Sequence, residues 1–107
     1  MSQFVKEINT QEFNALLEGG MPVVCDFFAT WCGPCRMLAP VMDEVAQELN
    51  DKAVFVKINT DENEELAVKY KIYSIPCVKI FKNGQEVAEN LGFVPKQALK
   101  AFVEQNI

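Results

Sequence analysis

The chain has 107 residues, of which 50% are hydrophobic and 23% charged, so it can bury a normal core and intrinsic disorder is not expected. Its 15 acidic and 10 basic residues give a net charge of −5, and no basic stripe is available to neutralise nucleic-acid phosphates. No apolar run approaches the roughly 18 residues of a membrane span, and the absence of histidine excludes Cys–His and Ser–His–Asp catalysis and histidine-ligated metal sites.

The length fits a single domain over residues 1–107, and the first residues carry no secretory signal. Residues 1–7 lack a basic start followed by a long apolar segment, which favours the cytoplasm, although a chain already trimmed would look the same. Four cysteines beside a good core do not indicate a small protein held by disulfides. In a reducing compartment, such cysteines are more often catalytic or metal-binding.

Thr10 is expected to cap a first helix, which ends at Gly19 and Gly20. The apolar stripe of this helix consists of Phe13, Leu16 and Leu17. The next segment, residues 23–29, is a nearly continuous apolar run that only Asp26 interrupts. Such a run is expected for a strand buried on both faces.

A long helix is predicted after the cysteines, because apolar residues recur there at helical spacing. These residues are Met37, Leu38, Val41, Met42, Val45, Ala46 and Leu49. Pro34 suits the first turn of this helix, where its missing N–H costs little. Pro40 falls inside the pattern and should kink the helix.

Residues 53–58 indicate another buried strand, which Lys57 interrupts. Asn63 is expected to cap a short helix that carries acidic residues in its first turn. Lys69 and Lys71 lie near the end of that helix, so its charges complement the helix dipole.

Residues 77–81 and 86–91 are predicted to form two strands joined by a tight hairpin at Asn83-Gly84. Pro95 then opens a last helix, whose predicted apolar face consists of Ala98, Leu99, Phe102 and Val103. The predicted order is β-α-β-α-β-α-β-β-α, in which the opening strand has no assigned residues. Alternation favours parallel pairing of the first three strands, whereas the final hairpin must be antiparallel, so we expect an α/β fold with a central mixed sheet flanked by helices.

Two thiols, Cys32 and Cys35, lie where the apolar run meets the predicted long helix. A thiol at a helix N-terminus loses its proton more easily, and the thiolate is the reactive form. The second sulfur, about one helical turn further on, is close enough to form a disulfide with the first and to release whatever the first has attacked. The simplest interpretation is a redox switch that exchanges disulfides with other proteins.

Three alternatives compete with this interpretation. A zinc module could use the four thiolates of Cys25, Cys32, Cys35 and Cys77, but only one Cys-x-x-Cys unit is present and the other two cysteines lie inside predicted strands. A non-catalytic interaction domain could use the thiol pair to switch a complex. An oxidase or isomerase of secretory compartments is disfavoured by the missing signal and by the residues between the two thiols.

The chain closely resembles the thioredoxin family over essentially its whole length. The resemblance rests on DFFATWCGPC at residues 26–35, on Ala39-Pro40, on Ile75-Pro76 and on FKNG at residues 81–84. The WCGPC motif is highly specific on its own. Lys57 and Gly92 also fall at the matching positions of the family. The resemblance implies a thioredoxin fold and a protein that reduces protein disulfides by dithiol–disulfide exchange, in the service of cell redox homeostasis.

The same resemblance implies that Cys32 is the attacking nucleophile, that Cys35 is the more buried resolving thiol, and that the two form a disulfide after turnover. Gly33 and Pro34 would shape the turn and tune the redox potential. Pro34 adds no charge, whereas a histidine there would stabilise the thiolate and make the pair more oxidising. Reducing members of the family carry this Gly-Pro dipeptide, so we expect a reductant.

Asp26 is the most informative residue outside the thiol pair. A carboxyl group inside a dry strand should have its pKa raised by desolvation. The resemblance implies that Asp26 assists proton transfer at Cys35 through water, with Lys57 as its partner. The alternative is an Asp26–Lys57 ion pair kept for structure alone.

Pro76 resembles the cis-proline that faces the active-site disulfide in this family. It would expose the backbone of Ile75, with which an extended client segment could pair like a strand. A flat apolar docking surface would be completed by Trp31, Gly33, Pro34 and Gly92. A tryptophan directly before an exposed thiol favours surface contact over a place in the core.

Cys25 lies inside an apolar run and is expected to be an unreactive core residue. Cys77 is expected to be either an unreactive core residue or a secondary redox or modification site. We expect no bound cofactor and no metal, because the electrons reside in the thiols. The resemblance implies a monomer that acts on disulfide-containing client proteins. It also implies a separate thioredoxin reductase, linked to NADPH or to ferredoxin, that regenerates the dithiol.

Overall fold

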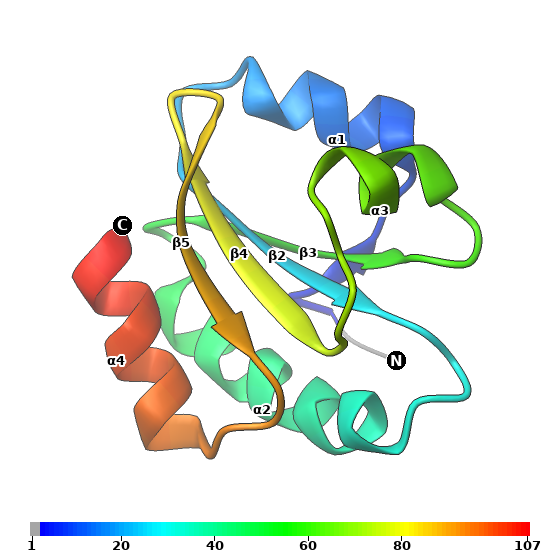
Figure 1. The fold of residues 1–107 in the computed structure, drawn as a ribbon. Helices are drawn as coiled ribbons and strands as arrows, with labels where there is room; N and C mark the ends of the chain where they lie inside the picture. The colour runs from blue at the N-terminus through cyan, green and yellow to red at the C-terminus, as the bar shows by residue number, and fades with distance from the viewer. Residues whose placement is uncertain (1–2) are drawn as a thin grey trace.

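The computed structural model describes residues 3–107, and five strands in it form one mixed sheet in the spatial order β1-β3-β2-β4-β5 (Figure 1). The strands are β1 (Lys6–Glu7), β2 (Val23–Phe28), β3 (Val54–Asn59), β4 (Cys77–Lys82) and β5 (Gln85–Leu91). The helices are α1 (Thr10–Leu17), α2 (Gly33–Leu49), α3 (Glu64–Lys69) and α4 (Lys96–Asn106). The predicted order of elements is confirmed, and the opening strand is now placed at Lys6–Glu7.

The sheet separates two hydrophobic cores. Strands β1, β2 and β3 run parallel, while β4 is antiparallel to both β2 and β5. Helices α1 and α3 cover one face and α2 and α4 cover the other (Figure 1). Because side chains alternate along a strand, Phe27 joins the core under α1 and α3 while Val24 joins the core under α2 and α4. The same alternation places Asp26 on the α2 side.

The β4–β5 hairpin follows the sequence prediction. Asn83 and Gly84 form its two-residue turn, with φ of 54° and 79°. Positive φ at both central residues matches the right-handed twist of the flanking strands, which is why Asn-Gly is favoured at such turns. The turn pairs Lys82 with Gln85 and Phe81 with Glu86, and a register shift between Ile80 and Phe81 changes the pairing along the rest of β5, the edge strand that leads toward Gly92.

The prediction that Thr10 caps α1 is wrong, because the capping residue is Asn9. The Asn9 side chain accepts a hydrogen bond from the Glu12 N–H at 2.9 Å, and the Glu12 carboxylate accepts one from the Asn9 N–H at 3.0 Å. This reciprocal arrangement satisfies two backbone donors that Thr10 could not reach together. The helix ends at Leu17, before Gly19.

Asn63 precedes α3 as predicted, but its side chain caps nothing in that helix. Its Oδ1 instead accepts hydrogen bonds from the N–H and the hydroxyl of Thr10, at 2.9 and 3.1 Å. The amide of Asn63 also donates to the Asn59 carbonyl at 3.0 Å. Asn63 therefore joins the start of α1 to the end of β3.

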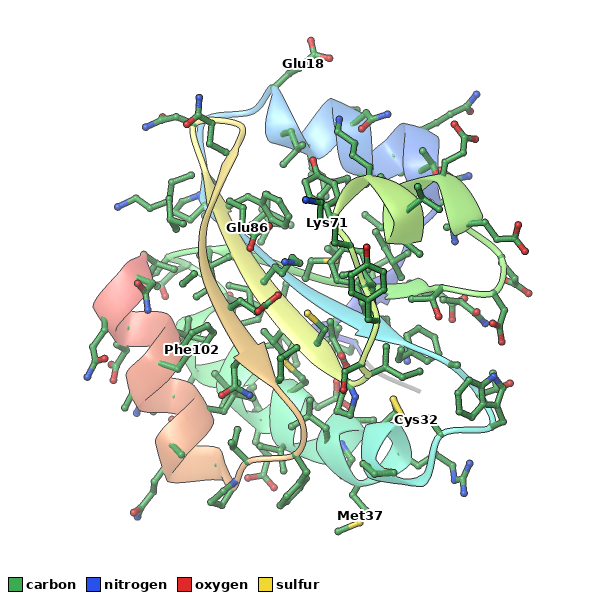
Figure 2. All side chains as sticks on the ribbon, viewed as in Figure 1. Glu18, Cys32, Met37, Lys71, Glu86 and Phe102 are labelled. Carbon is green, nitrogen blue, oxygen red and sulfur yellow. A yellow bond between two sulfur atoms is a disulfide. The ribbon has the colours of Figure 1, made fainter. Side chains whose placement is uncertain are left out.

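Two residues of the predicted helical stripes face solvent. Met37 is 59% exposed and points away from the sheet (Figure 2), and Ala98 is also exposed. Pro40 lies within α2 and does not end it, since the helix runs from Gly33 to Leu49. Across residues 3–107, every helix is too short or too polar to cross a bilayer.

Candidate active site

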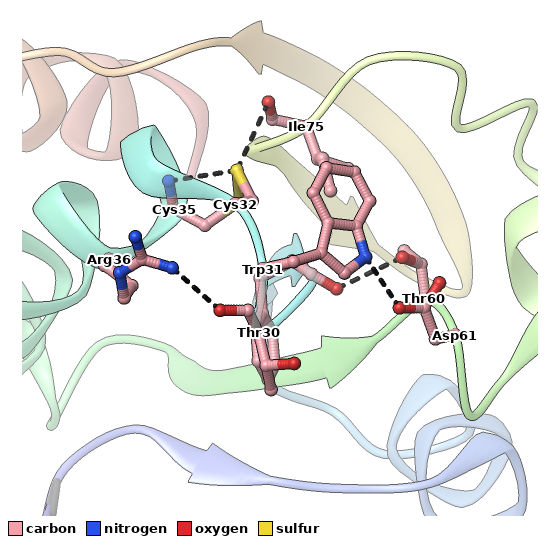
Figure 3. Close-up of a disulfide and its surroundings, with 9 residues drawn as sticks. Thr30, Trp31, Cys32, Cys35, Arg36, Thr60, Asp61 and Ile75 are labelled. Atoms are coloured by element: carbon pink, nitrogen blue, oxygen red, sulfur yellow. Dashed lines mark hydrogen bonds between the residues drawn. A yellow bond between two sulfur atoms is a disulfide. The ribbon is translucent and has the colours of Figure 1, made fainter.

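The candidate site lies where β2 ends and α2 begins. Cys32 is the N-cap of α2, and its sulfur is bonded to that of Cys35 in the first turn. The Cys32 Sγ also accepts a hydrogen bond from the Cys35 N–H at 3.2 Å (Figure 3). Pro34 lies in the same first turn, as predicted. The fold thus places the Cys32 sulfur at the positive end of a 17-residue helix, where it accepts a hydrogen bond from a backbone N–H that has no partner within the helix.

Exposure does not distinguish the two cysteines in this disulfide form. Cys32 is 5% exposed and Cys35 is 3% exposed, so the sequence-based expectation of one reachable and one shielded sulfur is not visible here. The two residues differ in position instead. Cys32 lies outside the helix, with its sulfur 3.8 Å from the Ile75 carbonyl oxygen, whereas Cys35 lines a cavity beneath α2.

Asp26 is buried in the middle of β2, with 3% of its surface exposed. Among the described residues, none forms a hydrogen bond with its Oδ1 atom. Burial raises the pKa of this carboxyl to about 7, against the opposing effect of the positive charge on Lys57. Asp26 is therefore partly protonated near neutral pH and able either to accept or to donate a proton.

Lys57 stands opposite Asp26 in the parallel β2–β3 register, yet its ammonium group turns elsewhere. The Lys57 Nζ lies 5.5 Å from the centre of the Phe28 ring, a cation–π arrangement. Within residues 3–107, the ion pairs do not include one between Lys57 and Asp26. Lys57 thus acts on Asp26 through charge at a distance, and the structure does not support a direct ion pair.

A cavity of about 260 Å³ connects Asp26 to Cys35, and we call it the Cys35 cavity. It is also lined by Phe28, Ala29, Thr30, Arg36, Ala39 and Lys57. Liquid water takes about 30 Å³ per molecule, so the space admits several waters next to an unpartnered buried carboxyl. A water-mediated proton path between the two groups is therefore sterically available.

The backbone beside the disulfide contains a cis peptide bond and a glycine with positive φ. The Ile75–Pro76 peptide bond is cis, and the Pro76 carbonyl accepts a hydrogen bond from the Gly92 N–H at 2.8 Å. Gly92 has a φ of +85°, and a Cβ built on it would meet no atom within 4 Å. Gly92 is thus required by its backbone conformation, and it leaves open space beside Pro76.

Trp31 is 69% exposed, as a surface contact requires. Its indole N–H donates to the Asp61 carboxylate at 2.9 Å (Figure 3). On the other side of the loop, the Arg36 guanidinium donates to the Thr30 carbonyl at 2.9 Å. Sequence reasoning missed Asp61 and Arg36, because nothing local in the chain links Asp61 to a residue 30 positions earlier.

Cys25 and Cys77 are free thiols inside the core under α1 and α3. Burial raises the pKa of the Cys25 thiol well above its ordinary value and that of Cys77 to about 12. The Cys77 Sγ also lies 3.6 Å from the Glu89 carboxylate, which pairs with the Lys79 ammonium at 2.7 Å. A thiol with such a pKa is almost entirely protonated at neutral pH, which weakens its nucleophilicity.

The zinc alternative lacks a gathered set of ligands. Two of its four cysteines are bonded to each other, and the other two lie inside the strand core. Over residues 3–107, the Cys, Asp and Glu side chains form no group of three or more that could hold a metal ion.

A mixed sheet with helices on both faces, carrying a Cys-x-x-Cys disulfide at a helix N-terminus beside a cis-proline, defines a thiol–disulfide oxidoreductase of the α/β class. The thioredoxin family model matches residues 4–105. The chain therefore belongs to the thioredoxin family.

Individual relatives agree with this assignment. Thioredoxin 1 of Synechococcus elongatus is 50% identical over 92 residues, which cover 86% of each chain. The chloroplastic M-type thioredoxin of Chlamydomonas reinhardtii is 46% identical over 99 residues, 92% of this chain and 71% of that one. The structure of Plasmodium falciparum thioredoxin superposes with a TM-score of 0.88 at 38% identity, covering 94% of this chain and 98% of that one.

The family assignment carries the function with it. Thioredoxins are disulfide oxidoreductases, and this chain presents the Cys32–Cys35 pair for dithiol–disulfide exchange with protein disulfides. Members of the family act together with reductases and with targets that bear disulfides. The two cysteines are thus the redox-active pair of this protein.

Proposed function

We propose that Cys32 is the nucleophile and Cys35 the resolving thiol of a protein-disulfide reductase. The Cys32 thiolate attacks a client disulfide, the client S–S bond breaks, and the first client sulfur leaves as a thiolate. Cys35 then loses its proton and attacks the Cys32 sulfur, which releases the second client sulfur and forms the Cys32–Cys35 bond. The client gains two electrons and the protein loses two. The observation that carries this assignment is the hydrogen bond from the Cys35 N–H to the Cys32 Sγ.

Asp26 takes the proton from Cys35 in this scheme, through water in the Cys35 cavity. The proposal is supported by the buried Asp26 carboxyl, whose Oδ1 lacks a hydrogen-bond partner among the described residues, by its pKa of about 7, and by the shared cavity. Lys57 holds that pKa lower than burial alone would set it. Gly33 and Pro34 keep the turn uncharged, which favours a reducing pair.

Clients are proposed to dock across Trp31, Ile75, Pro76 and Gly92 by pairing an extended segment with the Ile75 backbone. The exposure of Trp31 and the open space at Gly92 support such a surface. We further propose that the protein acts as a monomer with a reductase linked to NADPH or ferredoxin. The cytoplasm remains the proposed compartment, although one relative is named as chloroplastic.

A trapping experiment tests the division of roles. A Cys35→Ser variant incubated with disulfide-bearing proteins should accumulate mixed disulfides through Cys32, because the resolving thiol is gone. The matched Cys32→Ser variant should accumulate almost none. Equal trapping by both variants would contradict the assignment. Loss of Cys35→Ser trapping after alkylation of Cys32 alone confirms the site of attachment.

A further inference from the structure

Asp26 faces two cavities rather than one. Besides the Cys35 cavity, it lines a second space of about 220 Å³, which we call the Asp43 cavity. That cavity is also lined by Val5, Ala39, Pro40, Met42, Asp43 and Lys57. At about 30 Å³ per water, it too has room for several water molecules. Asp26, whose Oδ1 has no hydrogen-bond partner among the described residues, therefore lines two spaces on the α2 side of the sheet.

Each cavity is lined by solvent-accessible residues that the other lacks, although both also share half-buried Ala39 and Lys57. Exposed residues of the Cys35 cavity are Thr30 and Arg36, which directly flank the Trp31–Cys35 loop. The Asp43 cavity reaches the surface at exposed Pro40 and half-buried Asp43. Asp43 follows Cys35 by eight residues, or about 12 Å along the axis of α2. A client seated on the Cys32 face lies next to Thr30 and Arg36 and further from Asp43.

Both cavities share Asp26, Ala39 and Lys57. The Lys57 ammonium lies toward the Phe28 ring, which lines only the Cys35 cavity. Asp26 is therefore the buried acid that both spaces have in common. The charged groups around them are Lys57 in both, Arg36 in the Cys35 cavity and Asp43 in the Asp43 cavity.

We propose that the Asp43 cavity is a second proton route, through which Asp26 exchanges its proton with solvent while a protein client covers the Cys35 cavity. The inference rests on the proposed role of Asp26. Resolution needs Asp26 as a base, so in the mixed disulfide Asp26 must first lose its own proton to solvent before it accepts the proton that leaves the Cys35 thiol. No electrons move in this step. The Asp43 cavity lets the proton leave without release of the client.

The test compares resolution of mixed disulfides formed with a large and a small substrate, insulin and glutathione disulfide, by rapid acid quench. Asp43→Leu fills the mouth of the second cavity, and Asp43→Met is a more flexible alternative should the first variant fold poorly. Resolution with insulin should slow by more than about threefold, because the client covers the other route and general acid–base catalysis contributes about 10²–10⁴. Resolution with glutathione disulfide should be unchanged.

Gln47→Leu is the matched control, because it adds an apolar side chain one turn further along the same face of α2 and lines neither cavity. It should leave both rates unchanged. Equal slowing for both substrates by Asp43→Leu, or no slowing for either, overturns the second route. Asp26→Asn separates this failure from failure of the proposed proton transfer from Cys35 to Asp26. If this variant slows resolution with neither substrate, Asp26 has no role and that part of the proposed function is wrong.

Discussion

Asp26 is buried where its charged form is destabilised, so its ionisation changes the free energy of unfolding of the whole chain. The folded state holds the Asp26 pKa at about 7, above its ordinary value of 3.8. Folding therefore favours the protonated acid. The resulting stabilisation is fully present below about pH 4 and is lost as the pH rises through 7. The difference of about 3 pKa units corresponds to about 4 kcal/mol at most.

The size-matched variant Asp26→Asn cannot ionise and so escapes this penalty. We expect it to be more stable than the wild-type chain at pH 8 by up to about 4 kcal/mol, with the difference vanishing near pH 4. Urea unfolding of the oxidised proteins at several pH values measures this. Parallel stability profiles for the two proteins across pH 4–8 would show that Asp26 ionises normally in the folded state.

Pro34 is exposed in the first turn of α2, next to the sulfur of Cys32. A histidine cation at this position would stabilise the thiolate and hence the reduced form. Pro34→His should make the pair more oxidising by about 20 mV, the equivalent of about 1 kcal/mol, and more so at pH 6 than at pH 8. Redox equilibration with glutathione measures the shift. Neutral Pro34→Gln is the control, and an equal, pH-independent shift in both variants would rule out the charge effect.

At the scale of single elements, the β4–β5 hairpin depends on backbone conformation more than on side-chain contacts. Gly84 has a φ of +79°, whereas a Cβ at that position would meet only the Leu17 carbonyl oxygen at an ordinary 3.5 Å. Gly84→Ala should therefore destabilise the chain by about 1–2 kcal/mol through backbone strain. Gly20 has open space and no positive φ. Gly20→Ala should be neutral or slightly stabilising, and equal losses in thermal unfolding for both variants would refute the argument.

Elements were predictable where one local rule decides them. The Asn83-Gly84 turn and the apolar run of β2 follow from such rules. The cap of α1 was misassigned, because Asn9 and Thr10 are both good capping residues and only the reciprocal bond to Glu12 selects the first. Met37 belongs to the predicted apolar stripe of α2 but is exposed, because periodicity marks the centre of a helical face better than its edge.

At the scale of the whole molecule, the linear part of the site could be predicted and its cross-chain contacts could not. The Cys32–Cys35 pair lies within one motif, so its proximity follows from helical spacing. The bond from Trp31 to Asp61 joins segments that only the tertiary fold brings together. The position of Lys57 beside Asp26 followed from the family resemblance, but the turn of its ammonium toward Phe28 depends on side-chain packing that no local pattern encodes.

The fold places the four cysteines of this chain in different environments, so we expect them to differ in reactivity. The Cys32 sulfur accepts a hydrogen bond from a helix N-terminal N–H, Cys35 lines the Cys35 cavity, and Cys25 and Cys77 are buried with raised pKa values. Alkylation of the fully reduced native protein at several pH values, with each adduct mapped and timed, measures the reaction rate of all four cysteines in one experiment. Cys32 should react first, with an inflection below the ordinary thiol value of about 8.5, while the other three stay unlabelled until the chain is unfolded. Labelling of Cys32 and Cys35 at equal rates with a shared inflection would contradict the account.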